Sequence, residues 1–496
     1  MLTRRTALAS GALTAAALSA PLQALAEGKK TSVTLALTLE PPGLDPTVNA
    51  ASSIAEVTLY NIYETLTKIN PDGSVSPLLA ESWEVSPDLK TYTLRLRRGV
   101  KFHNGEPCDA NAVKFSFDRA GGDKSTNKDK RLFAALTTRV VDEHTVVLLN
   151  QDIEPNLLFL LGQATAIIVE PKSVAGNATK PVGTGPYQLA DWRRGASITL
   201  AAWPEWRSAS QIRIRRATFR FISDQAAQVA ALLAGDVDAF PRVAPRGVAQ
   251  FKANPRFQVI ISGSRAKTIL AINNARQPLD NVRVRRAIAA AIDRKAVIQG
   301  AADGLGVPIG SHYVPGAFGY VDTTGINPYD PEKAKRLLAE AGVKLPLQLT
   351  MTLPPTPYAR QGGEVVAAML DKVGIQVKMQ NVEWAQWLSG TFRQKQYDLT
   401  IISHVEPFDL ANFTRRDYYW GYHSSRFDAL FDQIQHAARP ADRARLLGDA
   451  QRLLAEDCVH AFLYQPQWVT VAAKGLHGLW KDMPVFVNDL SVLSWS

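Results

Sequence analysis

Along most of this chain of 496 residues, stretches with the hydrophobic period of a β-strand alternate with stretches that have the period of a helix. Pro346–Leu353 is predicted as a strand, Glu364–Val373 as a helix and Ile375–Gln380 as the next strand. Another helix is predicted to begin at Asp330-Pro331, which supply an N-cap and a first-turn proline, and to end at Gly342. Because alternating elements of this kind pair their strands into a sheet that the helices cover, the pattern predicts the α/β fold class.

The first third of the chain adds further predicted elements. Thr31–Leu39 alternates as a strand, and Ile54–Thr67 has the spacing of a helix. From Trp83 the period changes to two, so that Trp83–Leu96 is predicted as a hairpin with one buried face and a turn at Pro87-Asp88. Gly121–Lys130 is strongly polar and is predicted as a surface loop.

The N-terminus has the pattern of a secretory signal peptide. Arg4 and Arg5 precede an Ala-rich apolar stretch, Thr6–Ala20, and Ala24-Leu25-Ala26 supplies the small residues of a cleavage site. We expect cleavage after Ala26 and a protein that is exported to the periplasm. The adjacent arginines favour the twin-arginine route, although they also occur in ordinary signals.

Two cysteines, Cys108 and Cys458, are present. An oxidising compartment usually converts cysteine pairs into disulfides. These two are far apart in the sequence, and we expect them in different domains. They are therefore predicted to be isolated buried thiols.

The common motifs of catalysis and nucleotide binding are absent. The chain has no phosphate-binding P-loop, no G-x-S-x-G nucleophile elbow, no H-E-x-x-H metal pair and no C-x-x-C. The histidines are dispersed without i, i+4 pairs, at His103, His144, His312, His404, His423, His436, His460 and His477. The sequence therefore predicts a protein without enzymatic activity, without a metal site and without a cofactor.

The chain carries 56 Lys and Arg against 46 Asp and Glu, a formal net charge of +10. Its two basic clusters, Arg213–Arg216 and Arg283–Arg286, are interleaved with apolar residues and are interpreted as solvated faces of buried elements. Neither combines the basic residues with stacking aromatics, which nucleic-acid sites use. A nucleic-acid partner is therefore not expected.

Several blocks, in order along the chain, resemble those of the family 5 extracytoplasmic solute-binding proteins of ABC importers, the family of dipeptide-, oligopeptide- and nickel-binding proteins. The blocks are Leu78–Ser86, Tyr92–Gly105, Val182–Tyr187, Leu232–Asp238, Asn281–Arg294, Tyr329–Gly342 and Val373–Trp384. One departure is Leu89, where the family commonly has Gly in the hairpin turn. Within these blocks the aromatics Trp83, Phe102 and Tyr187 are interpreted as core residues, and His103 as a structural turn residue.

The resemblance implies the two-lobed periplasmic binding protein fold of type II, with an extra subdomain inserted in lobe I. The lobes close on a ligand by hinge motion. The resulting divisions are a signal peptide at 1–26, lobe I at 27–52, 182–272 and 469–496, the inserted subdomain at 53–181, and lobe II at 273–468. The implied partners are a peptide or other small solute and an ABC permease in the inner membrane, and the protein is expected to be a monomer.

The resemblance also suggests where a ligand binds. In peptide-binding members an acidic residue after a Tyr-Asp strand pairs with the α-ammonium of the ligand, and Glu406 occupies that place, with Asp409 nearby. Trp384 stands where peptide binders have a cleft aromatic, and Asn49 follows the first strand from the opposite lobe. These four residues are predicted ligand contacts.

A departure from the dipeptide binders leaves the ligand open. Those proteins hold the ligand carboxylate with an Arg before a Pro-rich loop, where this chain has Leu353. Arg360 could substitute or could simply begin the following helix, and Tyr358 beside it is a further candidate. Longer peptides, opine-like amino-acid conjugates and other cationic small molecules therefore stay open. A metal chelate held by His404 or His423, as in the nickel-binding branch, is the alternative, and an exported enzyme is a third class.

Overall fold

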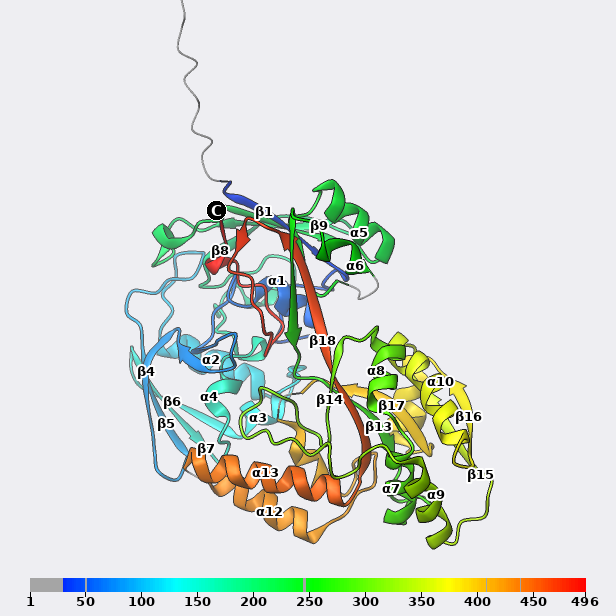
Figure 1. Cartoon of the computed structure of the whole chain (residues 1–496). Coiled ribbons are helices and arrows are strands. Elements are labelled where there is room, and N and C mark those ends of the chain that lie inside the picture. Colours follow the sequence, from blue (N-terminus) through cyan, green and yellow to red (C-terminus); the bar gives the residue numbers. More distant parts are fainter. Residues whose placement is uncertain (1–29, 50, 244–246, 407, 438) are drawn as a thin grey trace, which may run out of the picture.

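The computed structural model describes residues 30–49, 51–243, 247–406, 408–437 and 439–496. Figure 1 shows an upper lobe and a larger lower part, with the long strand β18 (His460–Ala473) running through both. The predicted signal peptide lies outside the described residues. Within those ranges, no helix has the length and apolar character needed to cross a membrane.

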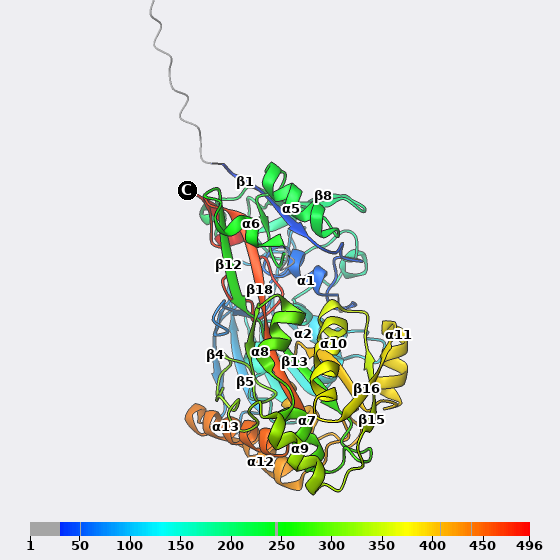
Figure 2. The same cartoon turned by 45° about the vertical axis from the view of Figure 1, so that its right-hand side comes forward.

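One mixed sheet extends through both lobes, in the order β16-β15-β17-β13-β18-β11-β1-β10-β9-β8, and β12 and β14 also pair with β18. Figure 2 shows β12 and β18 side by side between the lobes. The strands are β1 Ser32–Leu37, β8 Tyr187–Arg193, β9 Ser197–Ala202, β10 Arg216–Phe221, β11 Ala239–Phe240, β12 Phe257–Gly263, β13 Lys267–Ile272, β14 Gly306–Pro308, β15 Leu347–Leu353, β16 Ile375–Asn381 and β17 Leu399–His404. The predicted α/β class and two-lobed fold are confirmed.

Helices pack on this sheet in both lobes. In the lower lobe α7 to α10 cover β13, β15 and β17 and share one apolar core with them. The upper lobe contains α1 Ser52–Thr58, α5 Gln225–Ala234 and α6 Ala249–Lys252. The lower lobe contains α7 Val282–Ala290, α8 Arg294–Ala302, α9 Pro331–Glu340, α10 Pro357–Asp371, α11 Trp384–Gln386, α12 Ser425–His436 and α13 Pro440–Glu456. A short β19–β20 pair, Leu476–His477 with Ser494–Trp495, lies near the C-terminus.

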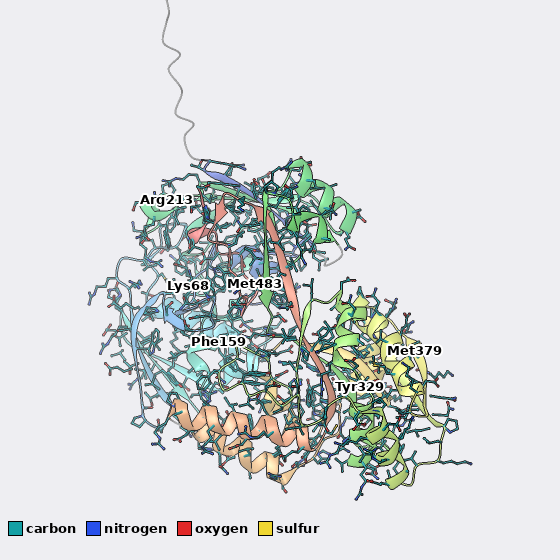
Figure 3. All side chains as sticks on the ribbon, viewed as in Figure 1. Lys68, Phe159, Arg213, Tyr329, Met379 and Met483 are labelled. Carbon is teal, nitrogen blue, oxygen red and sulfur yellow. The ribbon has the colours of Figure 1, made fainter. Side chains whose placement is uncertain are left out.

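A second sheet, in the order β4-β5-β7-β6, belongs to the stretch predicted as an inserted subdomain and has its own apolar core. The predicted subdomain also contacts the lower lobe. The rings of Phe159, labelled in Figure 3, and Phe408 lie 5.1 Å apart, and Arg443 donates to Asn156 Oδ1 at 2.6 Å. The elements of this predicted subdomain are β2 Thr67–Ile69 and β3 Val75–Pro77, which pair with each other, β4 Ala80–Val85, β5 Thr91–Leu96, β6 Leu136–Asp142, β7 Thr145–Asn150, α2 Ala110–Gly121, α3 Lys130–Ala134 and α4 Leu157–Leu160.

The pairing of β13 bears on the predicted division between the lobes. β13 lies between β17 and β18 and contributes to the core under α7 to α10. The division at residue 272 would therefore separate this strand from the sheet to which it belongs. We propose to place this division in the crossing segment Ser264–Ala266. Because Val57 and Leu59 belong to the apolar core of the upper lobe, we also assign α1 and Leu59 to lobe I and keep the other predicted bounds.

The helix predicted over Ile54–Thr67 is wrong beyond Thr58. The chain leaves the helix at Leu59, which is extended, and Tyr60 then has a φ of +60°, so the helix cannot continue. The turn is held by contacts with distant segments: the Tyr60 hydroxyl donates to the Gly162 carbonyl at 2.7 Å, and Asn61 Nδ2 donates to the Asn488 carbonyl at 2.8 Å. The helical spacing of the buried residues therefore did not reflect a continuous helix.

The predicted hairpin is present as β4 and β5, and within its predicted range the buried residues of the apolar face come from β5. Tyr92, Leu94 and Leu96 are buried, whereas Val85 on β4 is exposed. Leu89 in the turn has a φ of +58°, the left-handed conformation that glycine adopts without a Cβ penalty. This geometry accounts for the glycine that the family commonly has there.

Cys108 and Cys458 are both free and buried, as predicted. Burial raises the pKa of Cys458 to about 11, so the thiol is unreactive when folded. Beside it, Arg285 of the Arg283–Arg286 cluster is buried and donates to the backbone carbonyls of Leu279, Asp280, Asp457 and Cys458. The interpretation of this cluster as a solvated face is therefore wrong for Arg285, while Arg213 on lobe I is exposed (Figure 3).

Close backbone packing explains the glycines of the Val182–Tyr187 block. A Cβ on Gly183 would lie 2.0 Å from the Ile62 carbonyl oxygen. The Gly183 N–H donates to His103 Nδ1 at 3.3 Å, and His103 Nε2 lies 2.9 Å from the carbonyl oxygen of Gly185. Phe102 and Tyr187 are fully buried, so the block is scaffold as predicted.

Gly183→Ala is expected to lower the free energy of unfolding by at least about 2 kcal/mol, because the backbone of Ile62 cannot move away cheaply. Gly176→Ala is the matched control, since nothing lies within 4 Å of a Cβ there. Urea unfolding followed by circular dichroism measures both. Equal stabilities of the two variants would contradict the packing argument.

Candidate binding cleft

A cleft with a volume of about 430 Å³ opens where the two lobes and the inserted subdomain meet. Met483, labelled near the centre of Figure 3, is one of its lining residues. The lining residues are Pro46, Asn49, Ala51, Ser52, Ala55 and Leu59 from lobe I, Lys128, Gln163, Ala164 and Thr165 from the subdomain, Arg265, Ala266, Val405, Glu406 and Trp468 near the crossing strands, and Met483, Pro484, Val485 and Phe486. A volume of this size holds a small organic solute.

One wall of the cleft is aromatic. The rings of Trp468 and Phe486 stack with centroids 5.4 Å apart. The Arg242 guanidinium lies 4.9 Å from the Phe486 ring centroid and forms an ion pair with Glu56. Because the two rings stack on each other and Arg242 packs against Phe486, this wall offers a flat, rigid apolar surface to a solute.

Glu406 presents a carboxylate to the cleft. Its side chain is 63% exposed, and the hydrogen bond that its Oε2 accepts comes from the N–H of the adjacent residue Val405, at 3.2 Å. A carboxylate in this state can accept hydrogen bonds from a cationic group of a solute. The structure thus places this predicted residue in the cleft, and its contact with a ligand stays a prediction.

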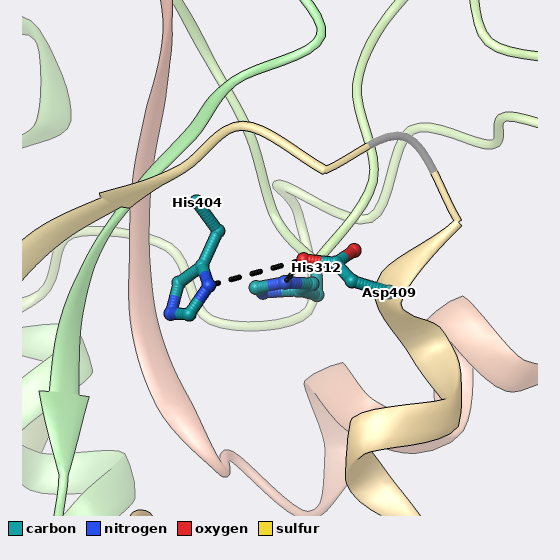
Figure 4. A group of neighbouring side chains, drawn as sticks. All are labelled: His312, His404 and Asp409. Carbon is teal, nitrogen blue, oxygen red and sulfur yellow. Dashed lines mark hydrogen bonds and ion pairs between the residues drawn. The ribbon is translucent and has the colours of Figure 1, made fainter. Parts of the chain in front are cut away.

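The backbone around Glu406 is held by a buried ion pair. Lys267, the first residue of β13, donates from Nζ to the Glu406 carbonyl and to Asp409 Oδ1, at 2.9 Å for the latter. His312 Nε2 lies 2.8 Å from Asp409 Oδ2 (Figure 4). Lys267 and Asp409 are both almost fully buried, so the pair ties the Glu406 segment to the sheet.

The ionisation states of this cluster follow from its burial. Burial by itself raises the pKa of the Asp409 carboxyl, but His312 and Lys267 outweigh it and hold that pKa well below its usual range. Burial lowers the pKa of His404 to about 3 and also lowers that of His312. Both rings are therefore neutral near pH 7, and the Lys267–Asp409 pair carries the charges.

His312, His404 and Asp409 bring one potential ligand atom each within 4.8 Å of one another, a donor set that suits a transition metal. The Lys267 ammonium beside Asp409 already supplies the positive charge at this place. His404 Nε2 is hydrogen-bonded to the Tyr419 hydroxyl at 2.9 Å. A metal ion here would add a second positive charge beside the buried Lys267 ammonium, so the group is better described as a packed ion-pair cluster.

The other predicted ligand residues are dispersed. Asn49 lines the cleft, but Asp409 and His404 are buried behind it. Trp384 is 41% exposed and packs edge-on against Trp387.

Tyr358 and Arg360 both lie in α10. The Tyr358 hydroxyl accepts from the Ser403 N–H at 3.3 Å, and Arg360 lies 3.5 Å from Glu383. Neither residue, nor Trp384, Asp409 or His404, is among the lining residues of the cleft.

Several lining residues were missed from the sequence. Lys128 lies in the polar stretch that was interpreted only as a surface loop, and Trp468 and Phe486 carry no motif. Arg265 was also missed, because no motif marks Ser264–Ala266 as the crossing between lobes. A break between two strand-like stretches there was the available signal.

Two α/β lobes that share a strand and enclose a cleft define a binding protein of the periplasmic type. The family described as bacterial extracellular solute-binding proteins, family 5 Middle, matches residues 74–419. The heme-binding protein A of Haemophilus influenzae is 27% identical over 480 residues, 87% of this chain and 85% of that protein. The dipeptide-binding protein of Escherichia coli is 29% identical over 382 residues, 70% of this chain and 71% of that protein.

Among solved structures, the chain is similar to AgaA of A. tumefaciens R10 in complex with agropinic acid, with a TM-score of 0.78 and 27% identity, covering 94% of this chain and 99% of that one. The chain belongs to the family 5 bacterial extracellular solute-binding proteins. The predicted family and the predicted role as the solute-binding component of an ABC importer are confirmed. Members of this family are binding proteins, and these relatives do not favour the nickel alternative.

Lys267→Met is expected to lower the free energy of unfolding by about 3–5 kcal/mol, because it leaves the Asp409 carboxylate buried without its cation. Asp409→Asn should cost a similar amount by stranding the Lys267 ammonium. The double variant removes both charges and should be at least about 2 kcal/mol more stable than the sum of the single losses predicts. Urea unfolding of the four proteins measures this coupling, and strictly additive losses would contradict it.

Proposed function

We propose that the protein captures a peptide or a related amine-bearing small solute in this cleft and delivers it to an ABC permease of the inner membrane. It acts as a monomer and catalyses no reaction. Two of the relatives are named for a dipeptide and for heme, and the similar AgaA structure holds agropinic acid, so members of this family differ in their ligands.

Glu406 is the observation that supports an amine-bearing ligand. Among the described residues that line the cleft it is the one acidic side chain, and it is largely exposed there. The Lys267 ammonium group holds the Glu406 backbone, so little backbone conformational entropy is lost when a ligand binds. The apolar wall of Trp468 and Phe486 offers a surface to the body of the solute.

Glu406→Gln keeps the shape of the side chain and removes its charge. We expect it to weaken binding of di- and tripeptides with a free N-terminus at least about tenfold, close to 1.4 kcal/mol, measured by titration calorimetry. N-acetylated peptides should bind the unaltered protein as weakly as the free peptides bind the variant.

Glu340→Gln is the matched control, because Glu340 is exposed on α9 outside the cleft. Equal affinities of Glu406→Gln and the unaltered protein would contradict the assignment of Glu406 but leave solute binding intact. Mass spectrometry of the solute released from the purified protein identifies the ligand independently of this panel. A released solute without an amine would contradict the proposed ligand class.

We further propose that residues 1–26 are removed on export to the periplasm. Intact mass of the periplasmic protein should correspond to a chain that begins at Glu27. Replacing Arg4 and Arg5 together by Lys separates the export routes, since a twin-arginine signal loses export and an ordinary signal keeps it. Recovery of the uncleaved chain from the periplasm would contradict the cleavage site.

A further inference from the structure

The charges in the cleft are not confined to Glu406. Among its lining residues, Lys128 and Arg265 are basic. Arg265 is already engaged, because its Nη1 donates to the Gly316 carbonyl at 2.9 Å. Lys128 is exposed, and no described residue forms a hydrogen bond or ion pair with its ammonium group. Lys128 is therefore the basic lining residue whose charged group has no partner among the described residues.

The backbone on both sides of Lys128 is anchored to the same cleft wall. Asn127 is buried, and its Nδ2 donates to the Thr165 carbonyl at 3.0 Å. The Thr165 hydroxyl donates to Asp129 Oδ2 at 2.6 Å, and the Asp129 N–H donates to Asn127 Oδ1 at 2.8 Å. These bonds also occupy the neighbouring Asp129 carboxylate. The backbone that carries Lys128 is therefore fixed at the cleft wall, and its exposed side chain is free to reach a solute.

The segment that holds the ligand carboxylate in dipeptide binders offers no cation to this cleft. Leu353 is buried at the end of β15. Arg360 lies on α10 beside Glu383 and is not a lining residue. An anionic group of a solute in the cleft would therefore need a partner from another wall.

We infer that Lys128 binds a carboxylate, or an equivalent anionic group, of the solute whose amine contacts Glu406. The two charges come from different walls, Lys128 from the inserted subdomain and Glu406 from the end of β17 in lobe II. The cleft thus selects a zwitterionic solute, and Lys128 determines that selection. This inference rests on the proposed function and adds the second charge to the ligand class.

The test uses two peptide libraries, di- and tripeptides with free C-termini and the same peptides as C-terminal amides. The unaltered protein should bind the free acids at least about fivefold more tightly than the amides, because a charge-assisted bond to Lys128 is lost. Lys128→Met should bind the acids as weakly as the amides, and Lys128→Arg should keep most of the preference. Titration calorimetry on the full mature chain gives the affinities.

Lys124→Met is the matched control, since Lys124 is an exposed lysine of the same polar stretch outside the cleft. It should bind both libraries as the unaltered protein does. Equal binding of acids and amides by the unaltered protein, or unchanged or tighter binding by Lys128→Met, would overturn the role of Lys128 and leave the proposed function standing. If neither library bound, the peptide part of the proposed function would fail, and this inference with it.

Discussion

The pairing of β12 with β18 between the lobes is the constraint on which the remaining structure depends. The two strands are antiparallel from Phe257 opposite Ala473 to Gly263 opposite Gln467. Beyond that point the chain crosses to β13, and Ser264 and Gln465 join the crossing by side-chain hydrogen bonds. Arg265, Ala266 and Trp468 of the cleft belong to this crossing. A rotation of the lobes about it would change the width of the cleft while this wall stays intact.

Next to the crossing, a buried ion pair also fixes the backbone that carries the exposed Glu406 carboxylate. Lys267 immediately follows the crossing and is held in the interior by Asp409, which in turn is bonded to His312. The same ammonium group binds the Glu406 carbonyl, so the free carboxylate projects from a fixed backbone. Lys128 on the opposite wall is held in a comparable way by Asn127 and Asp129. In both cases, interior hydrogen bonds fix the backbone that carries the ligand-binding side chain, which reduces the backbone entropy lost on binding.

Local signals predicted much of the fold. The Asp330 cap, the following proline and Gly342 defined α9 almost to the residue, because capping involves only neighbouring backbone groups. The hairpin of β4 and β5 was predicted for the same reason. The helix expected over Ile54–Thr67 failed where Tyr60 and Asn61 bond to Gly162 and Asn488, which are distant in sequence. Periodicity cannot reveal such contacts.

The sequence alone determined the family and the α/β class, since these follow from ordered motifs and local periodicity. It also identified Glu406 and Asp409 as two candidate ligand-binding carboxylates in one segment. Only the tertiary structure decided between their roles, because Lys267 comes from another element and neutralises the Asp409 carboxylate, to which His312 is also hydrogen-bonded. The same folding brought Lys128 from a polar loop to the cleft. Burial and charge pairing are properties of the assembled lobes, and no spacing along the chain encodes them.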